Sequence, residues 1–134
     1  MNKFGVIAMM AGFALSSGTM AEQPMTKDVY KAEKERIKDD YKADKARCGS
    51  YAGNAKDICF AEAEGKEDTA EADLEARYKP SKESRYKAAI AKAEADYGVA
   101  KEKCDDQSGN AKDICLKDAK ATEAAAKANA RKGE

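Results

Sequence analysis

Apolar and aromatic side chains recur at steps of 4, 3, 4, 3 and 4 residues between positions 86 and 104. An α-helix turns once in about 3.6 residues, so this spacing places them on one helical face. The stripe consists of Tyr86, Ile90, Ala93, Tyr97, Ala100 and Cys104. An earlier stripe with the same spacing consists of Tyr30, Lys34, Ile37, Tyr41, Asp44 and Cys48. Both segments are predicted to be amphipathic helices, and the later one has the more continuous apolar face.

A stripe of small residues follows each of these segments. One consists of Cys59, Ala63 and Ala70, and the other of Cys115, Ala119 and Ala126. Large side chains on one helix and alanines on its neighbour allow two helices to approach closely. We predict four helices, over residues 29–48, 54–78, 82–104 and 110–131.

Residues that favour helix ends separate the predicted helices. Asn54 and Asn110 are predicted to be helix caps, because an asparagine side chain accepts hydrogen bonds from the free N–H groups of a first turn. Pro80 ends the second helix, since the residue before a proline disfavours helical geometry, and Ser81 caps the third. Four exposed pairs are expected at i, i+4: Glu62–Lys66, Glu75–Lys79, Glu83–Lys87 and Glu123–Lys127.

The chain contains an internal repeat with an offset of 56 residues. The block Gly-Asn-Ala-Lys-Asp-Ile-Cys occurs at 53–59 and again at 109–115, and 14 of 31 positions are identical between 30–60 and 86–116. Two units are fewer than an open solenoid needs. We therefore expect an all-α fold of two paired antiparallel hairpins, over 22–79 and 80–134, rather than an open array.

Residues 1–21 have the pattern of a secretory signal peptide. Lys3 gives a positive start, residues 4–15 are apolar apart from two glycines, and Thr19 and Ala21 are the small residues before a cleavage site. About 12 apolar residues are fewer than the roughly 20 that span a bilayer. Cleavage after Ala21 predicts a periplasmic protein, secreted through the inner membrane, with no stable membrane insertion.

Composition limits the core and the chemistry. The alanine-rich chain has 25 basic and 25 acidic residues and no histidine. Balanced charge argues against a nucleic-acid partner, and the lack of histidine removes the commonest general base and metal ligand. Large apolar residues are few, and small domains with thin cores usually need a covalent or metal link.

Each predicted hairpin carries a Cys-x10-Cys pair across its loop. Four cysteines allow three connectivities, of which the repeat favours Cys48–Cys59 and Cys104–Cys115. Export to an oxidising compartment favours disulfides. The alternatives are a zinc site, which usually has closer cysteines or histidine, and a thiol exchange centre, which usually has Cys-x-x-Cys. We expect two disulfide-closed hairpins without metal or cofactor.

Other candidate sites are weak. Asp105 and Asp106 lie in a loop that lacks the alternating acids and the closing glutamate of a calcium site. The carboxylates are interleaved with lysines, so no acid–base pair stands out. We predict no catalytic residue, and we expect the protein not to be an enzyme.

The repeated Gly-Asn-Ala-Lys-Asp-Ile-Cys block, each time after a Lys-x-Lys/Arg-Cys run, resembles a family of small exported proteins of Gram-negative bacteria. These proteins are often labelled TolA-like or cell-envelope proteins. The resemblance covers most of residues 30–131 and implies a periplasmic address without naming an activity. The chain has nothing similar to the globular C-terminal domain of TolA.

Three functions follow as hypotheses. The first is a non-enzymatic periplasmic helical protein with an interaction or cell-envelope maintenance role. The second is a small stress-related holdase chaperone, and the third is a thiol–disulfide oxidoreductase that uses one cysteine pair. In the first, a protein partner or a second copy would bind the tyrosine–alanine helix faces.

Overall fold

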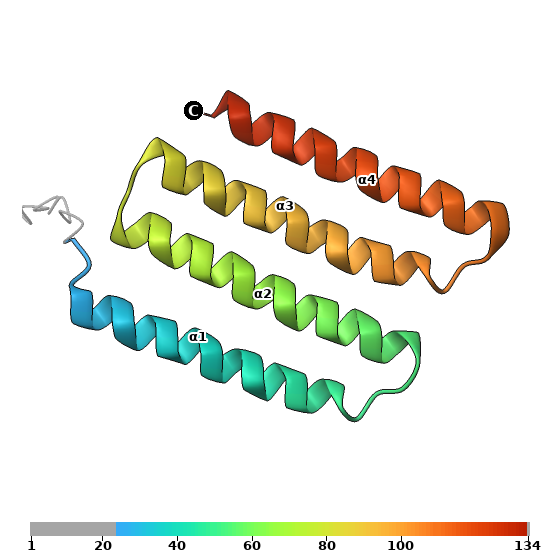
Figure 1. Cartoon of the computed structure of the whole chain (residues 1–134), viewed down its shortest axis with the longest axis horizontal. Helices are drawn as coiled ribbons and strands as arrows, with labels where there is room; N and C mark the ends of the chain where they lie inside the picture. The colour runs from blue at the N-terminus through green and yellow to red at the C-terminus, as the bar shows by residue number, and fades with distance from the viewer. Residues whose placement is uncertain (1–23, 134) are drawn as a thin grey trace, which may run out of the picture.

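The computed structural model describes residues 24–133 as four antiparallel helices (Figure 1). They are α1 (Lys27–Cys48), α2 (Asn54–Tyr78), α3 (Lys82–Cys104) and α4 (Gly109–Lys132). The four predicted helices are confirmed, with ends that differ by at most two residues. No strand occurs in residues 24–133. The predicted signal peptide, 1–21, lies outside the described residues.

The four helices lie side by side in one layer, in the order of the chain (Figure 1). In the described part of the chain, helices contact each other only as α1 with α2, α2 with α3, and α3 with α4. The two hairpins are therefore paired through α2 and α3, as expected. The expectation against an open array is wrong, because α1 and α4 do not meet to close a bundle.

Side-chain caps fix the starts of two helices. Thr26 Oγ1 accepts a hydrogen bond of 3.3 Å from the N–H of Val29 at the start of α1. At the start of α3, the hydroxyls of Ser81 and Ser84 each accept from the backbone N–H of the other, both at 2.9 Å. Pro80 follows α2 by two residues, so the predicted stop and the predicted Ser81 cap are confirmed.

The prediction that Asn54 and Asn110 cap helices is wrong. Asn54 is the first residue of α2, and the cap position is Gly53, with φ of 57°. Ser108 occupies the cap position of α4 without a side-chain hydrogen bond, and Gly109 has φ of 55°. A left-handed glycine therefore makes each turn, which only glycine does without steric cost. Asn54 therefore lies one residue after the cap position of its helix, and Asn110 lies two residues after the cap position of its own.

The interior of the layer is thin and follows the seams between neighbouring helices. Its buried apolar residues are Ile37, Cys48, Ala63, Leu74, Ala88, Ala93 and Cys104. Leu74 and two disulfide-bonded cysteines are the largest side chains with less than 2% exposure in the described residues. So small a core is consistent with a fold that depends on its covalent links.

The two hairpins meet closely where Gly65 of α2 faces Ala95 of α3. A Cβ added to Gly65 would lie 2.8 Å from the Cβ of Ala95, well inside the optimal carbon–carbon separation of about 3.5–4.0 Å. Gly65 is buried. The absence of a side chain at this position therefore sets the spacing of α2 and α3.

Candidate functional site

Each hairpin is closed by a disulfide across its loop. Cys48 is bonded to Cys59 and Cys104 to Cys115, with Cα separations of 5.5 and 5.6 Å. Both predicted pairings are confirmed, and the described residues include no free cysteine. Cys48 is 0% exposed and Cys104 is 1% exposed. Thiol–disulfide exchange requires a thiolate to reach a disulfide sulfur. Because Cys48 and Cys104 are buried, their sulfur atoms are hard for an attacking thiolate to reach.

The predicted stripes of large residues lie in the seams. Their buried members are Ile37, Cys48, Ala93 and Cys104, and Tyr86, Ile90, Tyr97 and Ala100 are half-buried. The two charged members of the first stripe bind α2, since Lys34 lies 4.0 Å from Glu71 and Asp44 lies 2.8 Å from Lys66. Ala126 is exposed, so the small-residue stripe of α4 leaves the α3–α4 seam before the helix ends.

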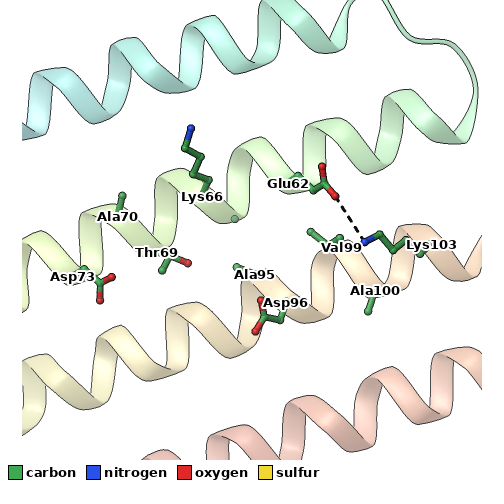
Figure 2. Close-up of a pocket in the computed structure, with 11 residues that line it drawn as sticks. Glu62, Lys66, Thr69, Ala70, Asp73, Ala95, Asp96, Val99, Ala100 and Lys103 are labelled. Atoms are coloured by element: carbon green, nitrogen blue, oxygen red, sulfur yellow. Dashed lines mark ion pairs between the residues drawn. The ribbon is translucent and has the colours of Figure 1, made fainter.

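A groove runs along the seam between α2 and α3 (Figure 2). It has a volume of about 610 Å³. Its apolar lining consists of Gly65, Ala70, Ala95, Val99 and Ala100. Charged side chains from both helices surround this floor (Figure 2). We call it the seam groove.

Two further grooves continue the seam groove. A groove of about 1190 Å³ lies where Pro80 joins α2 to α3, and it shares Thr69, Ala70 and Asp73 with the seam groove. A third, of about 620 Å³ between α3 and α4, shares Ala100 and Lys103 with it. The shared residues place all three on one side of the layer. We call this side the grooved face, and the largest recess the Pro80 groove.

The lysines of the seam groove are paired with acids. Glu62 binds Lys103 across the seam at 3.8 Å (Figure 2), and Lys66 binds Asp44 of α1 at 2.8 Å. The hydrogen bond from Lys66 holds the pKa of the Asp44 carboxyl below its usual value. The predicted Glu62–Lys66 pair is not formed, because each residue has a partner on a neighbouring helix. The other three predicted pairs are formed: Glu75–Lys79, Glu83–Lys87 and Glu123–Lys127. The expectation that all of them are exposed is wrong for Glu123, which is buried.

Asn54 links the two hairpins instead of capping α2. Its Nδ2 donates a hydrogen bond of 2.9 Å to the carbonyl oxygen of Glu102, in the last turn of α3. The same carbonyl oxygen also accepts a 3.1 Å hydrogen bond from the N–H of Asp105, directly after α3. Asn110, at the same position of the second unit, is exposed. The repeated blocks are identical, so no local sequence signal separates the two asparagines; α3 lies beside α2, whereas α4 lies at the edge.

An aromatic contact joins the start of α1 to the end of α2. The rings of Tyr30 and Tyr78 stack with centroids 4.2 Å apart. The Tyr30 hydroxyl donates a 2.9 Å hydrogen bond to Glu75, and this bond raises the pKa of the Tyr30 phenol. The helical spacing placed Tyr30 on the inner stripe, but it gave no signal for Tyr78 as its partner.

Glu67 and Glu123 occupy equivalent positions in the two units and have opposite surroundings. Burial, and then the nearby Glu71 carboxylate, raise the pKa of Glu67. Lys120 and Lys127 bind Glu123, each at 2.8 Å, and their hydrogen bonds lower its pKa. Glu123 is only 6% exposed. The buried carboxylate of α4 is therefore neutralised by two lysines, whereas its counterpart on α2 lies near three acids and one lysine, Lys45.

In residues 24–133, no three His, Cys, Asp or Glu side chains come together as ligands for a metal ion. Over the same range, no helix has the length and apolar character needed to cross a membrane.

No known protein family, curated protein or solved structure matches this chain. Function is therefore inferred from the grooved face, the disulfides and the charges of the described residues.

Proposed function

We propose that this chain is an exported periplasmic protein that works by binding and not by catalysis, in an interaction or cell-envelope maintenance role. The observation that supports this most is the single layer of helices. A closed bundle hides its apolar stripes, whereas a layer leaves a face of every helix open, and here that face is grooved. The two disulfides fit an oxidising compartment, as does the resemblance to small exported proteins.

The floor of the grooves supports binding more than the charged rim does. Exposed Lys–Glu pairs contribute about 0–1 kcal/mol each and are screened by salt. Small apolar residues such as Ala70, Val99 and Ala100 provide a concave surface that a ligand can desolvate. Specific binding is therefore expected on the grooved face.

Site-specific photo-crosslinking in the native envelope tests this function. The photoreactive group is placed at Asp96, which is exposed and lines the seam groove, or at Lys101, an exposed residue of α3 outside all three grooves. The proposal expects discrete adducts from position 96 that are several-fold stronger than any from position 101. Equal labelling from both positions, or none from position 96, would contradict it.

The export step has its own test. Mass spectrometry of the protein recovered from the envelope should find a chain that begins at Glu22. A species that begins at Met1 would contradict cleavage after Ala21 and, with it, the proposed address.

A holdase is the second candidate function. Large hydrophobic side chains remain exposed at Val29, Tyr51 and Ile114, each about half accessible. A holdase would suppress aggregation of many unrelated unfolded clients at stoichiometric amounts, whereas the first proposal expects selective adducts.

A thiol–disulfide oxidoreductase is the third candidate, and reductase or isomerase turnover by the purified protein would overturn the proposal of a non-enzyme.

Self-association through a helix seam has a separate prediction. Ile90 and Tyr97 of α3 are half-buried, and Lys120 of α4 covers the Tyr97 ring at 4.7 Å. Replacing Ile90 and Tyr97 with serine should weaken self-association or partner capture more than replacing Lys34 and Tyr41. Equal effects would show that both seams only hold their own hairpins together.

A further inference from the structure

We propose that the Pro80 groove binds one molecule of an anionic amphiphile, with its phosphate on the groove's arginines and its alkyl chain on the alanine floor. The inference rests on the proposed function in one respect, that the grooved face is the binding face, and it names a class of ligand. The groove has a volume of about 1190 Å³ and is lined by α1, α2 and α3, by Pro24 and Met25 before α1, and by Pro80. Ligand sites for small molecules commonly occupy about 300–1,000 Å³.

Arginine is scarce in this chain and concentrated in this groove. The chain has 5 arginines and 20 lysines. Arg36, Arg77 and Arg85 line the groove, and they come from α1, α2 and α3 in turn. Their presence in one groove is therefore a product of the layer and not of one helix's periodicity. A guanidinium can donate two parallel hydrogen bonds to a phosphate, which the ammonium group of lysine cannot match.

Two of these arginines are available to a ligand. Arg36 and Lys92 each bind an acid three or four residues away on their own helix. Arg77 and Arg85 are exposed and have no ion-pair partner among residues 24–133. The lining as a whole carries four basic and two acidic side chains. The Pro80 groove therefore has an uncompensated positive charge.

The seam groove lies on the same face and has no such excess of unpaired positive charge. Its two lysines, Lys66 and Lys103, are both paired with acids. The repeat does not account for the difference either, because the positions equivalent to Arg77 and Arg85 are occupied by Gly133 and Val29. The free arginines are thus specific to one end of the layer, where α1 and α3 begin and α2 ends.

The floor favours an alkyl chain over a peptide. Ile37 and Ala88 are buried, at 8% and 9% exposure, and Ala70, Ala76 and Ala89 add further small side chains to the apolar part of the lining. The groove's walls are helices whose N–H and C=O groups bond within the helix, so an extended acidic peptide finds no backbone partners there. An alkyl chain needs none. A phosphate head beside such a floor therefore matches the groove better than an acidic peptide does.

Calorimetric titration of the purified, oxidised protein tests the inference. The probes are dodecyl phosphate below its micelle concentration, dodecyl maltoside as the uncharged amphiphile of equal chain length, inorganic phosphate, and a poly-glutamate peptide. We expect one dodecyl phosphate bound per chain, and much weaker binding of the other three. Arg77→Gln with Arg85→Gln should weaken dodecyl phosphate binding at least about tenfold, because charge-assisted bonds to the phosphate are lost.

A matched control removes the same amount of charge from the seam groove. Lys66→Gln with Lys103→Gln should leave dodecyl phosphate affinity within about twofold, because these lysines already have acidic partners. Equal losses in the two double variants would overturn the inference, since binding would then follow net charge alone. It would also be overturned by equally tight binding of inorganic phosphate or dodecyl maltoside, by tighter binding of poly-glutamate, or by no binding of dodecyl phosphate.

The two proposals fail separately. Adducts at position 96 without dodecyl phosphate binding would overturn this inference alone. Dodecyl phosphate binding that depends on Arg77 and Arg85, without adducts at position 96, would overturn the binding role proposed for the seam groove and leave the amphiphile site standing.

Discussion

Gly65 of α2 and Ala95 of α3 are so close that the hairpins would have to move apart to admit one more carbon atom, which would lie 2.8 Å from the Ala95 Cβ. The two residues belong to different repeat units. Their contact therefore ties two separately cross-linked hairpins into one layer. The equivalent of Gly65 in the second unit is Ala121, on α4, where the layer ends.

Gly65→Ala should destabilise the protein by about 1–3 kcal/mol, the usual cost of inserting a carbon into a packed seam. Gly98→Ala is the matched control, because it makes the same change inside α3 where nothing lies within 4 Å of the added Cβ. The control should stabilise by about 0.5–1 kcal/mol, since alanine favours helix over glycine. Urea unfolding measures both. A Gly65→Ala protein as stable as the wild type, or more stable, would show that the seam tolerates a side chain at position 65.

Asn54→Ala and Asn110→Ala should change the stability of the protein by different amounts, although the two residues lie in identical sequence blocks. Asn54 donates to the Glu102 carbonyl across the α2–α3 seam, so its loss should cost about 0.5–1.5 kcal/mol. Asn110 is exposed and its loss should be close to neutral. Thermal unfolding of the two variants checks this, and equal destabilisation would restore the capping role that the sequence suggests.

Removal of either disulfide should lower stability by a similar, large amount. Both bonds close loops with a sequence separation of 11, which corresponds to about 3 kcal/mol on the chain-entropy description. Cys48→Ala with Cys59→Ala, and Cys104→Ala with Cys115→Ala, should each show a loss of this size in urea unfolding. The unaltered protein should expose no reactive thiol when denatured without reductant. A decrease of less than about 1 kcal/mol in the free energy of unfolding of both double variants would show that the hairpins are stable without their disulfides.

Glu123→Gln and Glu67→Gln should have opposite effects on stability at neutral pH. Two lysines lower the pKa of Glu123 below its ordinary value of 4.5, so its ionised form stabilises the folded state. That contribution is present above the ordinary value and is lost as pH falls through the lowered pKa. Glu123→Gln should therefore destabilise at pH 7 and make little difference in strong acid.

The pKa of Glu67 is raised, mainly by burial, so its ionised form opposes folding. Glu67→Gln should stabilise at pH 7, and the gain should vanish as pH falls through the raised pKa, where the wild-type carboxyl is protonated. Unfolding curves between pH 3 and pH 7 measure both variants. A stabilising Glu123→Gln or a destabilising Glu67→Gln at pH 7 would contradict these assignments.

The helices and the disulfides were predictable because their signals are local or repeated. Helical spacing and Pro80 place the helices, and the equal spacing of the two cysteine pairs selects one connectivity from three. The cap prediction failed at Asn54 for an equally local reason. The glycine before it makes a left-handed turn, and the choice between an asparagine cap and a glycine turn depends on φ, which residue type alone does not determine.

The single layer and the grooves were not predictable, because they depend on which helix faces meet. Alanine-rich stripes fit several neighbours almost equally well, and they contain no charge or shape that excludes a closed bundle. The pairing of Lys66 with Asp44, 22 residues away, and the gathering of Arg36, Arg77 and Arg85 follow only once α1, α2 and α3 lie in order. No periodicity within a single helix contains that information.

The single layer is the claim on which both proposals depend, and the distance between α1 and α4 tests it most directly. Spin labels at Asp39→Cys on α1 and Ala124→Cys on α4 occupy exposed positions at the two edges. Neighbouring helices pack about 8–10 Å apart, so three seams should separate the two helix axes by roughly 24–30 Å in pulsed electron paramagnetic resonance, before the label arms add to it. A single distribution at or beyond that distance is the predicted result. Axes about 10 Å apart, as in a closed four-helix bundle, would contradict the layer and with it the grooved face.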